Sequence, residues 1–176
     1  MKGKLKLENG KEIDIELSEK QLKEIQPKKK KKTGYERVSK CEKYYVSDNS
    51  ISCGYCDLNE EANLYDDNFY KNADYYSNKT LTLNNTRADT LMRQLRRFAV
   101  ENSEKELDWH WHNDCKYYIY YNYNCHAIDV GSSDGSLVAI RYFGQIYFDS
   151  KKVAKKAINE FKEELLWYFT EYRDRV

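Results

Sequence analysis

The stretch Lys116-Tyr-Tyr-Ile-Tyr-Tyr-Asn-Tyr-Asn124 opens the part of the chain that decides the fold, and Phe148-Asp-Ser-Lys-Lys-Val-Ala-Lys-Lys-Ala-Ile158 begins its last element. Tyrosine-rich runs broken by short polar turns are typical of antiparallel strands. We therefore predict strands at about 116–123, 126–131, 136–143 and 145–148. Apolar residues then recur at three- and four-residue steps, which predicts one long helix over about 150–172, with Ser150 as its N-cap.

A second apolar stripe with helical spacing precedes these strands. It predicts an amphipathic helix over about 87–102, capped by Asn84 or Asn85. The stripe consists of Ala88, Leu91, Met92, Leu95, Phe98 and Ala99. The order of these elements indicates an α+β fold, in which one or two antiparallel sheets pack against the two amphipathic helices.

Further upstream, two strands at 42–47 and 50–55 are predicted to pair around a turn at Asp48-Asn49. Residues 57–76 are acidic and aromatic, and we expect an ordered loop there, held by its aromatic residues and with room for a helical turn. Near the N-terminus, residues 5–17 alternate apolar and charged side chains around Asn9-Gly10, which predicts a β-hairpin.

A short helix should follow this hairpin and end before Pro27, because proline cannot continue a helix. Next comes an unbroken basic run of Lys28, Lys29, Lys30, Lys31 and Lys32. We therefore expect a small hairpin-helix module at 1–26, a lysine-rich linker at 27–33 and a main α+β domain at 34–176.

Charge is balanced over the whole chain but not along it. The net charge is +1, whereas residues 1–40 hold 13 basic and 7 acidic side chains and residues 41–75 hold 2 and 8. Such adjacent fields can pair with each other or face different partners. The charged N-terminus resembles no signal peptide, and no apolar run is long enough to cross a membrane. We expect a soluble cytoplasmic protein.

The cysteines and histidines form two clusters that could hold a structural zinc ion. Cys53 and Cys56 have the spacing of a ligand pair, and a second group contains His110, His112 and Cys115. A tetrahedral site needs four such ligands, so two from each cluster would suffice. The second spacing matches no standard zinc module, and the cysteines could equally pack as small apolar residues. A redox role for Cys53-Gly-Tyr-Cys56 is disfavoured, because no helix opens directly after it.

Two sets of residues are candidates for binding a macromolecule. The acidic and aromatic set could imitate the charge of a nucleic acid in a basic groove; it comprises Asp57, Glu60, Glu61, Tyr65, Asp66, Asp67, Phe69 and Tyr70. The basic set could contact phosphates or carboxylates; it comprises the five lysines at 28–32 with Arg93, Arg96 and Arg97. No nucleophile elbow or phosphate-binding glycine loop is present, so we expect a binding protein rather than an enzyme.

Several segments resemble a family of small accessory proteins encoded by phages and prophages of Gram-positive bacteria. They are Thr33–Val38, Lys43–Tyr45, Arg93–Ala99, Lys116–Tyr121, Gly144–Ser150 and Leu165–Tyr172. The resemblance covers roughly residues 33–175, and the N-terminal hairpin is similar to a short module found in front of various phage proteins. No catalytic residue carries over from it.

Small phage proteins of this kind often inhibit host defences, so the resemblance implies an inhibitor. The most concrete expectation is an anti-CRISPR protein that blocks a Cas9-type nuclease, or its guide RNA complex, by occupying a nucleic-acid-binding surface. Two alternatives remain open at this point: a nucleic-acid-binding phage accessory protein, and a small zinc-binding protein.

Overall fold

The computed structural model describes residues 2–6, 10–16, 18, 32–109, 115–133 and 142–174. The chain divides into two compact units, Met1–Lys32 and Thr33–Val176. In the first, β1 (Lys2–Lys6) pairs antiparallel with β2 (Glu12–Glu16), with Leu5 opposite Ile13. This is the predicted hairpin, with Gly10 in its turn at φ +80°. The predicted helix before Pro27 lies outside the described residues.

The second unit is mixed α+β, as the sequence predicts. Its strands β3 (Lys43–Ser47) and β4 (Tyr55–Asn59) form an antiparallel pair. Helices α2 (Leu64–Lys71) and α3 (Lys79–Asn102) follow. A three-stranded antiparallel sheet then has the order β6-β5-β7. Its strands are β5 (Lys116–Asn122), β6 (Ala127–Ser133) and β7 (Tyr147–Phe148), and α4 (Lys151–Glu160) and α5 (Lys162–Thr170) complete the unit.

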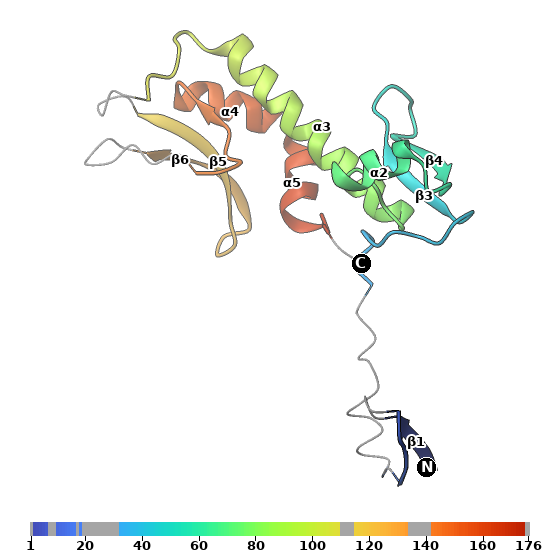
Figure 1. The fold of residues 1–176 in the computed structure, drawn as a ribbon. Helices are drawn as coiled ribbons and strands as arrows, with labels where there is room; N and C mark the ends of the chain where they lie inside the picture. The colour runs from blue at the N-terminus through green and yellow to red at the C-terminus, as the bar shows by residue number, and fades with distance from the viewer. Residues whose placement is uncertain are drawn as a thin grey trace. The chain divides into compact units, whose positions relative to one another are not determined.

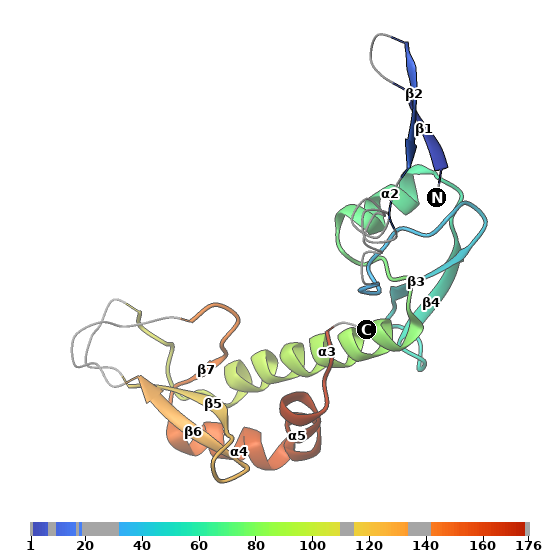
Figure 2. The ribbon, with the colours of Figure 1, turned by 90° about the horizontal axis from the view of Figure 1, so that it is seen from below.

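Helix α3 connects two hydrophobic cores. Helix α4 lies beside its C-terminal half, whereas β3 and β4 lie beside its N-terminal half (Figures 1 and 2). The larger core, which we call the sheet core, contains Leu91, Leu95, Phe98, Ala99, Ile119, Val130, Phe148, Val153, Ala154, Ala157 and Leu165. The smaller one, the β3 core, contains Tyr44, Val46 and Tyr75. The predicted stripes of both long helices therefore face the sheet core.

Two predicted boundaries are wrong. The partner of β3 is not 50–55 but 55–59, because a longer loop intervenes, closed by Asp48 N–H donating to Gly54 O. Helix α3 begins at Lys79, where the Asn78 side chain accepts from Leu81 N–H. Neither Asn84 nor Asn85 caps it, since both lie inside the helix.

The long C-terminal helix is also interrupted, at Phe161, where the backbone leaves the helical region (φ −107°, ψ 24°). The ring of Phe161 packs edge-on against Phe98, 5.7 Å between centroids. Ser150 is the N-cap, as predicted, and accepts from Val153 N–H. Of the predicted strand at 136–143, only Tyr142 and Phe143 are described, and they are not in a strand.

Candidate partner-binding surface

Helix α2 replaces the loop predicted for residues 57–76, and its start is fixed by a complete capping box. The Asn63 side chain accepts from the N–H groups of Tyr65 and Asp66, while the Asp66 side chain accepts from Asn63 N–H. Asp66 also accepts from Glu61 N–H at 2.9 Å and from the Tyr44 hydroxyl at 2.7 Å. These bonds satisfy the free N–H groups of the first turn and orient the helix over the β3 core.

A second buried carboxylate, Glu60, holds the segment before α2. It accepts two hydrogen bonds from the Arg37 guanidinium, at 3.0 and 2.8 Å, and one from the Tyr75 hydroxyl at 2.8 Å. Tyr75 stacks on Tyr44 with ring centroids 4.0 Å apart. Both carboxylates are therefore joined to one pair of stacked tyrosines, which makes this part of the chain a rigid support for α2.

The electrostatics of this network follow from its hydrogen bonds. The Arg37 guanidinium lowers the pKa of Glu60 below that of an ordinary glutamate, against the opposing effect of burial. For Asp66, burial is the largest influence and raises the pKa, but the bonds from Tyr44, Asn63 and Glu61 together hold it below the usual value. Burial raises the pKa of Tyr44 and of Tyr75. The carboxylates are thus charged and the phenols neutral at pH 7.

Large apolar side chains project from the outer side of α2. Leu64 is 69% exposed, Tyr65 75% and Tyr70 45%. The Arg37 guanidinium carbon lies 5.9 Å from the centre of the Tyr70 ring. Phe69 is half-buried and packs against the β3 core instead. An apolar pair on a rigid support has the features of an interface anchor, because little entropy is lost when a partner covers it.

The predicted acidic set is only partly on the surface. Glu60 and Asp66 are buried and bonded internally, so neither is available to a partner in this fold. Asp57 pairs with Lys43 at 2.6 Å and Asp67 with Arg37 at 2.6 Å. Glu61 is exposed, and from the described residues its carboxylate accepts one long bond, from Asn63 Nδ2 at 3.4 Å. The five predicted carboxylates therefore cannot all form one surface that imitates nucleic acid, because Glu60 and Asp66 are buried.

Only part of the predicted basic set lies within the described residues. Lys28, Lys29, Lys30 and Lys31 lie outside the described residues, and Lys32 is exposed. Arg93, Arg96 and Arg97 are exposed on α3, opposite the stripe that faces the sheet core. Arg93 donates to Thr90 Oγ1 at 3.1 Å. Arg97 lies 3.9 Å from Glu101, one turn further along the helix.

Of the two predicted zinc clusters, Cys53, Cys56 and Cys115 lie within the described residues, whereas His110 and His112 lie outside them. The thiols of Cys53 and Cys56 donate to different acceptors, Tyr55 O and Asp48 Oδ2, each at 3.3 Å. The bond to Asp48 raises the pKa of Cys56, which disfavours the thiolate that zinc requires. Cys115 is half-buried. Within the described ranges, no group of three or more potential ligands is assembled.

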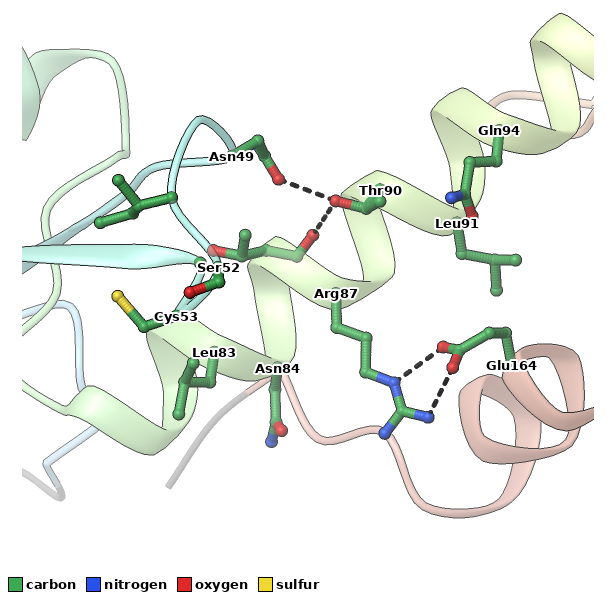
Figure 3. A pocket seen from close by; sticks show the side chains of 13 residues that line it. Asn49, Ser52, Cys53, Leu83, Asn84, Arg87, Thr90, Leu91, Gln94 and Glu164 are labelled. Atoms are coloured by element: carbon green, nitrogen blue, oxygen red, sulfur yellow. Dashed lines mark hydrogen bonds and ion pairs between the residues drawn. The ribbon is translucent and has the colours of Figure 1, made fainter.

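A polar groove of about 540 Å³ lies between the β3–β4 loop, α3 and α5 (Figure 3). Arg87 crosses it and donates to both oxygens of Glu164, at 2.7 and 2.9 Å, while its guanidinium lies 4.0 Å from the centre of the Trp167 ring. The pair is neutral, and Asn49 at the far wall accepts from the Thr90 hydroxyl at 2.8 Å. These contacts join α5 to α3 and the β3–β4 loop to α3, so the groove is first of all a structural junction.

Comparisons of the chain with protein-family models, with curated proteins and with solved structures give no match. Among the helices formed by described residues, none combines the length and the apolar character needed to cross a membrane.

Sequence reasoning missed the partners that define this surface. Arg37, Tyr44 and Tyr75 were not singled out, although they hold Glu60 and Asp66, because the pairing spans 15 to 23 residues. One signal was available. Asn63 and Asp66 have the three-residue spacing of a capping box, although Asp66 replaces the usual glutamate or glutamine.

Proposed function

We propose that the protein is a binding protein that inhibits a host defence complex in the host cytoplasm, and that its partner is a Cas9-type nuclease or the guide RNA complex of one. The observation that carries the binding role is the exposed pair Leu64 and Tyr65 on the first turn of α2. The choice of partner comes from the resemblance to phage accessory proteins.

The contact would combine an apolar centre with an acidic edge. Leu64 and Tyr65 would enter a pocket of the partner. Glu61, three residues before Leu64, would meet a basic residue at the rim of that pocket. Asp67 could exchange its pairing with Arg37 for a basic residue of the partner, because its side chain is 42% exposed. Aromatic anchors of this kind supply most of the binding energy of an interface, and rim charges mainly supply steering.

The direct test is DNA cleavage by a purified Cas9-type nuclease with its guide RNA, from a Gram-positive host, with the protein in molar excess. We expect inhibition by the native chain and a loss of inhibition by Leu64→Ser with Tyr65→Ser. A truncated anchor typically costs about 2–4 kcal/mol of binding, so inhibition should weaken at least 30-fold.

Tyr123→Ser is the control. Tyr123 is exposed to a similar degree as Tyr65, 69% against 75%, but it lies in the β5–β6 turn. This variant should inhibit as the native chain does. Full inhibition by the α2 variant would overturn the proposed surface, and cleavage that proceeds unchanged with the native chain would overturn the proposed partner.

A further inference from the structure

Helix α4 has a strongly basic outer face. One side of α4 is buried in the sheet core through Val153, Ala154 and Ala157. The lysines between and before these residues are exposed to solvent. We call Lys151, Lys152, Lys155 and Lys156, all of them exposed, the α4 lysine face. Lys162, just beyond the break at Phe161, is exposed too and extends the basic surface.

These lysines differ from three other cations of the second unit, Arg37, Lys43 and Arg87, which are held in ion pairs. Arg37, Lys43 and Arg87 each bond a carboxylate at 2.6 to 3.0 Å. No lysine of the α4 lysine face forms an ion pair with another described residue. Their ammonium groups are therefore exposed to solvent and form no ion pair within the part of the chain that the structure describes.

The position of the lysines opposes helix stability. The first turn of α4 contains no acidic residue and begins with Lys151 and Lys152, beside the positive end of the helix dipole. By contrast, α2 and α5 both have two acids in the first turn. Lys151 and Lys155 are also like charges one turn apart, as are Lys152 and Lys156. Burial of Val153, Ala154 and Ala157 offsets these unfavourable terms, so the lysines are not there to stabilise α4.

We infer that the α4 lysine face binds the phosphate backbone of a nucleic acid. Lys152 and Lys156 lie about 6 Å apart along the helix axis, so both can reach successive phosphates of one strand. Lysine ammonium groups contact phosphates as point charges. The face contains neither arginine nor an aromatic ring, the groups that read or stack on bases. Binding should therefore be independent of sequence and strongly dependent on salt.

This inference is separate from the proposed inhibition, since it uses a different face and is measured with free nucleic acid in the absence of any nuclease. Its test is fluorescence anisotropy of the full chain with a short labelled single-stranded RNA, and with the DNA of the same sequence, over a series of KCl concentrations. The native chain should bind both, with an affinity that falls as salt rises.

Lys152→Gln with Lys156→Gln should weaken binding roughly fivefold at low salt and reduce the slope of log K against log salt by about 1.4, or about 0.7 for each lost phosphate contact. Lys40→Gln with Lys71→Gln is the control, because it removes two exposed lysines elsewhere and changes net charge equally. Both pairs are also compared in chains with glutamine at positions 28–32, which removes any contribution of the lysine run.

The α4 variant should fold at least as stably as the native chain, with Tm higher by about 1 °C, because glutamine removes the repulsion with the dipole and between lysines. Equal affinities and salt slopes for the α4 variant and its control would overturn the inference. So would a labelled polyglutamate that binds as tightly as RNA and loses the same affinity in the α4 variant, since the face would then recognise an acidic polypeptide.

Discussion

At the scale of single residues, Glu60 shows how one buried charge determines local structure. Its carboxylate accepts from Arg37 and Tyr75, which are 23 and 15 residues away, and also from Ala62 N–H at 2.8 Å. If one partner is removed, the remaining polar groups stay buried but lose a hydrogen bond that had replaced their contact with water. The stability of the fold is therefore sensitive to each member of this network.

We predict that Glu60→Gln lowers the free energy of unfolding by about 1–3 kcal/mol at pH 7, because glutamine has one acceptor oxygen for three donor groups. Acid should affect the native chain in the same way. The pKa values of Glu60 and Asp66 are lowered on folding, so their stabilisation is complete above ordinary carboxyl pKa values and is lost as pH falls through the folded ones. Tm should fall from about pH 5 downward.

Thermal unfolding by circular dichroism between about pH 7 and pH 2 measures both effects. The Glu60→Gln variant should depend less steeply on pH than the native chain below about pH 5. Glu61→Gln is its control, since that neighbouring carboxylate is exposed and should change neither Tm nor its pH dependence. An unchanged pH dependence in Glu60→Gln would contradict the role given to Glu60.

The same residue marks the limit of sequence-based interpretation. Glu60, Glu61 and Asp66 are equivalent in a count of charge, yet two are buried and one is exposed. The burial of Glu60 and Asp66 depends on hydrogen-bond partners that lie 15 to 23 residues away in the sequence. No local sequence pattern identifies such partners. The charge of residues 41–75 was thus correctly identified, but its availability to a partner was not.

At the scale of elements, apolar periodicity located α3 and the α4–α5 region but not their ends, and it missed α2. The N-terminal turns of α3 bury Thr82, Asn85 and Thr86, which are polar, so the apolar stripe is visible only from Ala88. In α2 the first turn exposes Leu64 and Tyr65, so no stripe is visible at all. Phe161 is apolar and in phase with both α4 and α5, so the break there has no signal in the pattern.

We predict that Asn78→Ala lowers the free energy of unfolding by about 1 kcal/mol, because it removes the side-chain oxygen that accepts from Leu81 N–H at 2.9 Å. Asn84→Ala should leave stability within about 0.5 kcal/mol of the native chain, since Asn84 lies inside α3 on the groove wall. Urea unfolding of the two variants distinguishes them. A larger loss for Asn84 would place the cap where the sequence first suggested it.

At the scale of the molecule, the second unit contains two hydrophobic cores, the sheet core, which includes residues of α3, and the β3 core, whose strand β3 contacts α3. Two side chains of α3 make further polar links within the unit. Asn85 is buried and donates to the Tyr35 hydroxyl at 2.7 Å, and it accepts from the Tyr172 hydroxyl at 2.9 Å. Arg87 links α3 to Glu164 and Trp167 on α5. Asn85 thus ties the start of the unit to its end, and Arg87 fixes α5 against α3.

We predict that Asn85→Ala with Arg87→Ala uncouples the β3 core from the sheet core. Three buried residues form the β3 core and eleven form the sheet core, so the smaller should open first once the junctions are lost. Amide hydrogen exchange reports both at once, through β3 and α4. In the native chain, the amides of β3 and of α4 should give similar opening free energies. In the variant, β3 should exchange at least tenfold faster relative to α4, a difference of about 1.4 kcal/mol.

The control is Arg96→Ala, which changes an exposed arginine on the same helix and should leave the opening free energies of β3 and α4 equal. An equal loss of protection in β3 and α4 would mean that packing along α3 alone couples the cores, and that the polar junctions only stabilise the unit as a whole.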